Sequence, residues 1–297
     1  MAAVPALGAT RATAQTTTAT AATTNSQAQA AATPALPPSK HRIATCNILL
    51  DQAVHKGTDL DWHGGRREYC IELIQEQNAD VICLQEVAAL QNKDFTEAFQ
   101  GYRQHGFVGP TSDRNLPGFA AIRNVIYFRD DRYEQTSAGG YTLSYSPLEE
   151  HVKLPGEGVG LARHVSWVRL KDRKTGGEMR VLNTHWSLKT LLRQMEARIM
   201  AQEAAQYLPD FPQILCGDLN SNLDSPEQTI LQAANWSDSY LAVNPEGSPG
   251  FWPANKRIDM ILLRGKVRAL GAHRVEHALK NGLRPSDHPF FVSDVEI

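Results

Sequence analysis

The sequence has few cysteines, and they lack the spacing that a zinc site or a redox pair requires. The four are Cys46, Cys70, Cys83 and Cys216, and no two of them form a CxxC motif. Structural zinc sites and dithiol redox centres use such close pairs. Three of the four lie inside apolar runs typical of strands, so we expect buried free thiols.

Long apolar runs and a charge excess of one sign are also missing. No stretch approaches the roughly 18 apolar residues that cross a bilayer, so we expect no transmembrane segment. The net charge is −2, from 30 basic and 32 acidic side chains. This balance argues against a strong general attraction to nucleic acid. It does not exclude a nuclease, because a local basic rim would not show in the total.

Residues 1–40 contain no acidic and no aromatic residue and consist mostly of Ala, Thr, Gln and Pro. Such a stretch cannot bury enough apolar surface to offset its ordering entropy, so we predict a disordered tail. Residues 2–9 resemble the end of a signal-peptide apolar stretch, although a basic segment before it is missing. This likeness favours export to the periplasm or outside the cell over the cytoplasm, and the unpaired cysteines count against it. Residues 41–297 are predicted to form one domain.

The hydrophobic pattern of residues 41–297 predicts many strands separated by a few helices. We expect strands at 41–50, 79–84, 124–129, 132–143, 162–170, 179–186, 213–216, 258–263, 267–275 and 289–295. Helical spacing covers 62–77, with Asp61 as its cap, and helices are also expected at 88–99, at 188–207 and after Ser225-Pro226. This order predicts an α+β protein in which two packed sheets carry helices on their outer faces.

Six of the apolar strands end or begin with a small polar cluster. The clusters contribute Asn47, Glu86, His185, Asp218, Asn220, Asp259, Asp287 and His288. Amide and carboxylate oxygens suit a hard cation such as Mg²⁺. Two histidines with acidic neighbours suit proton transfer and the stabilisation of phosphate charge. The set as a whole therefore predicts one active site.

Taken singly, most of these residues have an ordinary structural explanation. Asn47 fits a turn, Glu86 fits a solvated strand end, and a lone His185 is usually structural. The segment from Asp218 to Asn220 fits an Asx turn. If it is instead extended, both side chains point to the same side.

Asp259 is harder to explain as structural, because it interrupts the apolar run 258–263. An unpaired carboxylate among such neighbours would be costly. We therefore predict that Asp259 has a partner, and a histidine is the obvious one.

The motifs together resemble those of the endonuclease/exonuclease/phosphatase family. The resemblance runs from about Arg42 to Ile297 and rests on motifs in family order: Thr45-Cys46-Asn47, Leu84-Gln85-Glu86-Val87, Asn183-Thr184-His185, Gly217-Asp218-Leu219-Asn220-Ser221, Ile258-Asp259 and Ser286-Asp287-His288. It implies a four-layered α/β/β/α sandwich of two mixed sheets, with the site at one edge of both sheets.

The resemblance also implies a metal-dependent hydrolase of phosphoester bonds, with phosphodiesters favoured. Asn47, Glu86 and Asp287 would hold Mg²⁺, which Mn²⁺ could replace. The enzyme is expected to be a monomer.

Roles in the reaction follow from the same resemblance. Asp218 would orient or deprotonate the attacking water. Asn220 and His185 would contact the scissile phosphate. His288, oriented by Asp259, would contact that phosphate or move a proton.

Three narrower or different functions stay open. A nuclease needs a basic surface, and its candidates are spread over the sequence: Arg103, Arg114, Arg123, Lys153 and Arg163. A lipid phosphodiesterase needs an apolar rim, which Phe251-Trp252-Pro253 could supply. A binding module that kept the fold without the chemistry is disfavoured by the complete set of site residues.

Overall fold

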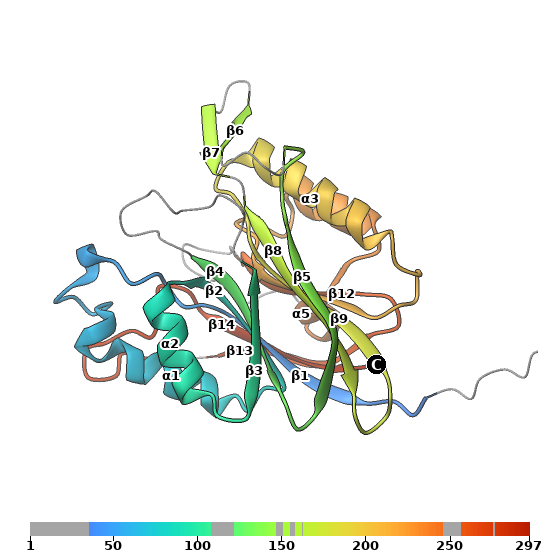
Figure 1. The fold of residues 1–297 in the computed structure, drawn as a ribbon. Helices are drawn as coiled ribbons and strands as arrows, with labels where there is room; N and C mark the ends of the chain where they lie inside the picture. Colours follow the sequence, from blue (N-terminus) through green and yellow to red (C-terminus); the bar gives the residue numbers. More distant parts are fainter. Residues whose placement is uncertain are drawn as a thin grey trace, which may run out of the picture. The chain divides into compact units, whose positions relative to one another are not determined.

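Two six-stranded mixed sheets form the centre of the structure, a computed structural model (Figure 1). It describes residues 36–107, 122–146, 151–154, 158–161, 163–245, 257–275 and 277–297, and only the backbone at 151–154 and 158–161. Leu36–Ile297 is one compact unit. The leader-like segment, most of the predicted tail, Arg114, the Lys153 side chain and Phe251-Trp252-Pro253 lie outside the described residues.

The first sheet has the strand order β13-β14-β1-β2-β4-β3. Its strands are β1 (Lys40–Asn47), β2 (Val81–Val87), β3 (Tyr102–Phe107), β4 (Arg123–Arg129), β13 (Arg268–Val275) and β14 (Phe290–Glu296). Only β1 and β2 run parallel, and the other neighbours are antiparallel. The C-terminal strand β14 therefore lies directly beside β1.

The second sheet has the order β11-β12-β10-β9-β8-β5. Its strands are β5 (Tyr133–Thr142), β8 (His164–Asp172), β9 (Glu178–His185), β10 (Gln213–Asp218), β11 (Ser237–Asp238) and β12 (Asp259–Arg264). Here β9 and β10 form the parallel pair. A separate hairpin of β6 (His151–Leu154) and β7 (Gly158–Leu161) projects at the top of Figure 1.

Helices cover the outer faces of both sheets. They are α1 (Arg67–Glu76) and α2 (Ala89–Ala98) on the first sheet and α3 (Thr190–Ala204) and α4 (Pro226–Ala233) on the second. The short α5 (Ser239–Val243) contacts β12 and β13, one strand of each sheet, and a 3-10 turn η1 (Ala53–His55) and a π-helical turn η2 (Trp62–Arg66) precede α1. Asp61 caps η2 as predicted, because its side chain accepts a hydrogen bond from the His63 amide. Ser225 caps α4, and Pro226 follows it in the first turn.

The central strands β1, β2, β4, β9, β10 and β12 are buried on both faces, which explains their nearly continuous apolar runs. In β2, Val81 and Cys83 belong to a core cluster that draws on both sheets, whereas Ile82 and Leu84 pack with α1 and α2. The second sheet alternates in the same way between this inner core and a cluster under α3 and α4. Three apolar layers of this kind make a four-layered α/β/β/α sandwich, as the sequence predicts.

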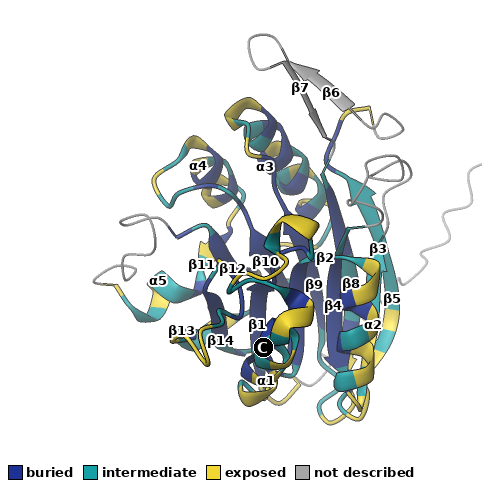
Figure 2. Ribbon diagram, turned by 90° about the vertical axis from the view of Figure 1, so that its left-hand side faces the viewer, coloured by how far each residue is buried: buried dark blue, intermediate teal, exposed yellow. Residues whose placement is uncertain are grey.

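The same alternation separates the buried centre from the exposed surface. Figure 2 shows dark blue strands in the middle and exposed residues on the helices and loops. All four cysteines are free and buried, as predicted. Within the described residues, no helix is both long and apolar enough to cross a membrane.

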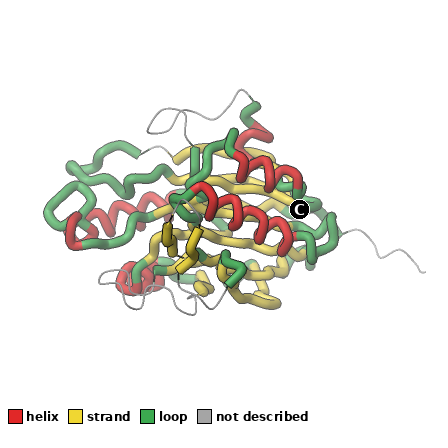
Figure 3. The backbone as a smooth tube through the Cα atoms, turned by 90° about the horizontal axis from the view of Figure 1, so that it is seen from above, coloured by secondary structure: helices red, strands yellow, loops and turns green. Residues whose placement is uncertain are grey.

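Loops gather at the two ends of the strands (Figure 3). Lys40 begins β1 at the end where the C-terminus is marked, because it pairs with Glu296 of β14. Asn47 therefore lies at the opposite end, together with the loops that carry the remaining site residues.

Candidate active site

In four strands, the series of alternate residues that face the inter-sheet core ends at a predicted site residue. Ile43 of β1 faces the inter-sheet core, and Asn47, four residues later, lies on the same side of the strand. By the same period of two, His185 ends the inner side of β9, Asp218 ends that of β10, and Asp259 begins that of β12. The site is thus the polar end of the inter-sheet core.

Strand register brings three of these residues side by side. Asp218 pairs with His185 on one side and with Asp259 on the other. The preceding residue, Gly217, allows β10 to approach β9 closely, because a Cβ built there would lie 2.1 Å from the Thr184 carbonyl oxygen. Any larger residue at 217 would push the two strand ends apart.

Asn47 links the two sheets at the floor of the site. Its buried Nδ2 donates to Glu86 Oε1 at 3.2 Å and to Asp218 Oδ2 at 3.1 Å. Its Oδ1 accepts the Leu49 amide at 3.1 Å. Glu86 has a φ of 60°, and its Oε2 accepts the Leu50 amide at 3.0 Å. The irregular backbone at the end of β2 turns this carboxylate toward Asn47.

His185 lies between two acidic groups. Its Nδ1 is 3.8 Å from Glu86 Oε1, and its Nε2 is 3.4 Å from Asp218 Oδ2. Burial lowers the pKa of His185 well below its usual value, and the positive charge of Arg163 lowers it further. The imidazole is therefore neutral near pH 7, with one nitrogen that donates and one that accepts.

Burial shifts the pKa of Asp218 in the opposite direction to that of His185, because Asp218 is an acid that becomes negative when it ionises. Burial raises the pKa of Asp218 to about 7, and the nearby Asp259 raises it as well. The His288 charge and hydrogen bonds from the Asn220 amide and Asn47 offset part of this effect. A carboxylate of raised basicity suits a group that accepts a proton.

Asp259 has the histidine partner that the sequence predicts. Its Oδ2 lies 2.9 Å from His288 Nδ1, and His288 Nε2 is 3.8 Å from Asp218 Oδ2. Burial works against the charged imidazole, but Asp259 and then Asp218 raise the pKa of His288 to about 10. His288 is thus a cation held between two carboxylates, while Asp259 Oδ1 is buried and has no hydrogen-bond partner among the described residues.

Of the two conformations that the sequence allows for the segment from Asp218 to Asn220, the structure shows the turn and not the extended one. β10 ends at Asp218, and Asn220 has a φ of 47°, so the chain turns there. The turn still joins the two residues, since the Asn220 amide donates to Asp218 Oδ1 at 2.9 Å. The Asn220 side chain lies 3.1 Å from His185 Nε2 and donates to the Trp186 carbonyl. This Asx-type turn is the alternative that the sequence also offers.

Asp287 is set apart from the other predicted residues. It is exposed, and its Oδ1 lies 3.4 Å from the Ser286 hydroxyl. Ser286 donates to the Asn47 carbonyl at 2.7 Å, which places this loop beside the end of β1. The structure thus brings seven of the predicted side chains into one network and leaves Asp287 at its exposed side.

Sequence reasoning missed the residues beneath this network. Gln85 Nε2 donates to Asn183 Oδ1 at 2.7 Å, and Asn183 Nδ2 donates to the carbonyls of Leu84 and Val125 at 2.9 Å each. These buried amides connect the two sheets one step below Asn47 and His185. The signal was available, because both residues share the period of two that leads to the site.

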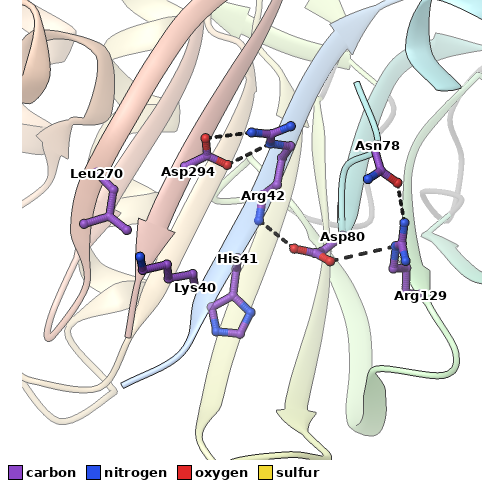
Figure 4. Close-up of a pocket in the computed structure, with 8 residues that line it drawn as sticks. All are labelled: Lys40, His41, Arg42, Asn78, Asp80, Arg129, Leu270 and Asp294. Carbon is purple, nitrogen blue, oxygen red and sulfur yellow. Dashed lines mark hydrogen bonds and ion pairs between the residues drawn. The ribbon is translucent and has the colours of Figure 1, made fainter. Parts of the chain in front are cut away.

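Two cavities lie elsewhere along the sandwich. One of about 520 Å³ opens at the far end of β1 (Figure 4) and is lined by Lys40, His41, Arg42, Asn78, Asp80, Arg129, Leu270 and Asp294. Its carboxylates are held by neighbouring arginines, and it is remote from Asn47. Another, of about 470 Å³, is lined by residues 51–53, 56, 61, 63 and 64 and adjoins the site through Leu50.

The donor set fits a divalent cation. Glu86 offers a carboxylate that is 23% exposed, Asn47 offers an amide oxygen, and Asp287 is exposed in the loop that Ser286 joins to the end of β1. Hard cations prefer oxygen ligands of this kind. Asp218, Asp259 and His288 also have ligand atoms within 4.8 Å of one another. In that second group, Asp259 Oδ2 already lies 2.9 Å from His288 Nδ1.

Comparison with known proteins decides the family. A sequence model of the Endonuclease/Exonuclease/phosphatase family matches residues 44–288. The chain belongs to this family. Members of the family are metal-dependent hydrolases of phosphoester bonds, so the protein is an enzyme of this class.

A curated relative and two solved structures agree with the assignment. The CCR4-Not complex 3'-5'-exoribonuclease subunit Ccr4 of Candida glabrata is 25% identical over 184 residues, which are 54% of this chain and 21% of that protein. An endonuclease/exonuclease/phosphatase from Bacteroides vulgatus is 20% identical with a TM-score of 0.72, over 86% of this chain and 98% of that one. A mannosyl-6-phosphatase of Bacteroides thetaiotaomicron is 22% identical with a TM-score of 0.69, over 86% and 99%. At these identities the solved structures support the fold alone.

Proposed function

We propose that this protein is a Mg²⁺-dependent phosphodiesterase whose active site is the network from Asn47 to His288. One observation carries the proposal. Four strands of two sheets deliver their last or first inner residue to one place, where the side chains contact one another and the solvent-accessible carboxylate of Glu86. A structural role would not need an accessible Glu86 near a buried His185 and a partly buried His288 in opposite protonation states.

The protein groups have complementary tasks in this proposal. Asp218 orients the attacking water and accepts its proton, because burial makes its carboxylate unusually basic. Neutral His185 and the amide of Asn220 donate hydrogen bonds to the phosphate oxygens. Protonated His288 supplies a positive charge to the same phosphate, and Asp259 keeps that charge in place.

Asn47, Glu86 and Asp287 are the proposed ligands of the cation. Bound there, it would act as a Lewis acid on a phosphoryl oxygen. Mn²⁺ shares the preference for oxygen ligands and is the natural substitute. The monomeric state stays a prediction.

The proposal does not commit to nucleic acid as the substrate. The Ccr4 relative is an exoribonuclease, which favours RNA. Arg103, one of the candidate basic residues, lies at the far end of the first sheet, because it pairs with Phe128, which in turn pairs with Val81. Arg123 is at the site end, where it pairs with Val87. Arg163 is also near the site, since its charge lowers the pKa of His185, so of the described candidates Arg103 lies away from it.

Isothermal titration with MnCl₂ and MgCl₂ tests the ligand assignment. Glu86→Gln keeps the shape of the side chain and removes its charge, so we expect at least about tenfold weaker binding. Glu97→Gln, on the exposed face of α2, is the matched control and should bind like the wild type. Equal affinity of wild type and Glu86→Gln would show that the ligand set is wrong.

A further inference from the structure

Arg66 is a fully buried cation next to the site, and no sequence motif singles it out. Arg66 is the last residue of η2, and its guanidinium carbon lies 4.8 Å from the centre of the Trp62 ring. Trp62 Nε1 in turn donates to Asp94 at 2.8 Å. A buried charge is costly unless hydrogen bonds compensate it. In the described part of the chain, the compensation comes from backbone carbonyls rather than from a carboxylate.

Two of these carbonyls follow Asn47 directly. Arg66 Nη1 donates to the Ile48 oxygen at 2.6 Å, and Nη2 donates to the Leu49 oxygen at 3.1 Å. Leu49 has a φ of 58°, which is unfavourable for a residue with a branched side chain and persists only where the surroundings enforce it. The guanidinium holds the peptide groups on both sides of this residue.

Each of the two peptide groups presents its N–H to a site residue. In a trans peptide the carbonyl and the following N–H point in opposite directions. When Arg66 holds the Ile48 carbonyl, the Leu49 N–H points to Asn47 Oδ1 at 3.1 Å. When it holds the Leu49 carbonyl, the Leu50 N–H points to Glu86 Oε2 at 3.0 Å.

A third carbonyl connects the same guanidinium to the C-terminal loop. Arg66 Nη1 also donates to the carbonyl oxygen of Pro285 at 3.3 Å, and Pro285 precedes Ser286, Asp287 and His288. One side chain therefore fixes the turn after β1 and the loop before β14 relative to each other.

We propose that Arg66 is a positioning residue that aims the Leu49 and Leu50 amides at Asn47 and Glu86 and so pre-orients the cation ligands. It touches neither substrate nor cation. This role rests on the proposed function of Asn47 and Glu86. Without Arg66, both side chains would sample other rotamers, and the cation would have to order them on binding.

Arg66→Lys tests the role, because lysine keeps the charge but cannot hold the carbonyls in a planar fork. We expect the Mn²⁺ dissociation constant, measured by titration calorimetry, to rise about 10–100-fold. With bis(p-nitrophenyl) phosphate, kcat should fall at saturating Mn²⁺ while KM stays within about threefold.

Arg180→Lys is the matched control. Arg180 is also fully buried and lies against aromatic rings, but it pairs with Glu203 at the other end of β9. This variant should lose stability by a similar amount and bind Mn²⁺ like the wild type. The comparison separates positioning from general destabilisation.

Circular dichroism will show whether Arg66→Lys folds. If it does not, Gln91→Met carries the test, since Gln91 Nε2 is the second donor to the Leu49 oxygen, at 2.9 Å. We expect about threefold weaker Mn²⁺ binding in that variant. Unchanged binding would overturn the role of Arg66.

The outcomes also separate this inference from the function on which it rests. Wild-type Mn²⁺ affinity in Arg66→Lys, with a loss in Glu86→Gln, would overturn the positioning role and leave the ligand assignment intact. Wild-type affinity in Glu86→Gln would overturn the ligand assignment itself.

Discussion

At the scale of single residues, two histidines in one site differ because of their surroundings. His185 is buried and lies near the positive charge of Arg163, which keeps its pKa low. His288 is partly buried, and Asp259 bonds its Nδ1 and raises its pKa to about 10. The site thus holds one neutral and one charged imidazole around a single carboxylate. This division gives each histidine a different task on a phosphate.

Asp259→Asn should lower kcat by about 10²–10⁴-fold, because the charge that holds the His288 cation is lost while the side-chain shape is kept. Steady-state hydrolysis of bis(p-nitrophenyl) phosphate measures the effect. Asp294→Asn, in an ion pair with Arg42 at the other end of the sandwich, is the control and should keep wild-type turnover. Equal turnover of both variants would contradict the role of Asp259.

The partner of Asp259 could be predicted from sequence, since the cost of burying a lone carboxylate requires one. The position of Asp287 could not, because exposure depends on how the loop after residue 284 leaves the sheet. The role of Arg66 could not be predicted either. Nothing in a sequence shows that a guanidinium will bind the carbonyls of Ile48 and Pro285.

At the scale of elements, strands buried on both faces were the easiest to predict. Val81 to Leu84 reads as an apolar run because alternate residues pack on different layers. Short or weakly patterned elements were missed, among them β11, α5 and the β6–β7 hairpin. The turn at Asn220 was left open, since Asp and Asn favour both a turn and a strand end.

The helix α3 carries a buried acid whose protonation should control stability. Glu196 accepts the Ser187 amide at 3.0 Å, and burial raises its pKa to about 7 from 4.5. Arg163 and Arg193 oppose this rise, and Glu227 adds to it. Because the folded-state pKa is the higher one, its contribution is complete below pH 4.5 and is lost as pH rises through 7.

Glu196→Gln imitates the protonated acid and should not lose that contribution. Urea unfolding should find the variant more stable than wild type by about 3 kcal/mol at pH 8, with the difference falling toward zero near pH 4.5. A difference that does not change with pH would show that Glu196 is not buried in its neutral form.

At the scale of the whole molecule, the two sheets meet through apolar packing and a small polar bridge under the site. The bridge is made by Gln85 and Asn183 and includes the carbonyls of Leu84 and Val125. Gln85 directly precedes Glu86, and Asn183 lies two residues before His185, so the bridge fixes the position of these two strand ends relative to each other. Family resemblance predicted the sandwich, but the contact between sheets depends on packing that no single strand reveals.

Asn183→Ala should destabilise the protein by about 2 kcal/mol, because it removes the buried hydrogen bonds to the Leu84 and Val125 carbonyls and one of those that the Gln85 amide donates. Urea denaturation measures the loss. Thr136→Ala removes an exposed hydrogen bond in the second sheet and should cost less than about 0.5 kcal/mol. A loss in Asn183→Ala as small as in this control would mean that the bridge does not hold the sheets.

The central claim is that the strand ends form a metal-dependent phosphodiesterase site, and hydrolysis of bis(p-nitrophenyl) phosphate tests it most directly. The assay compares wild type, Asp218→Ala and Asp224→Ala, with Mg²⁺ or Mn²⁺ and with EDTA. Asp224 is an exposed acid in the same loop and serves as the control. We predict turnover that EDTA abolishes, that Asp224→Ala retains and that Asp218→Ala loses by about 10²-fold or more while staying folded. Turnover that survives EDTA or the loss of Asp218 would contradict the account.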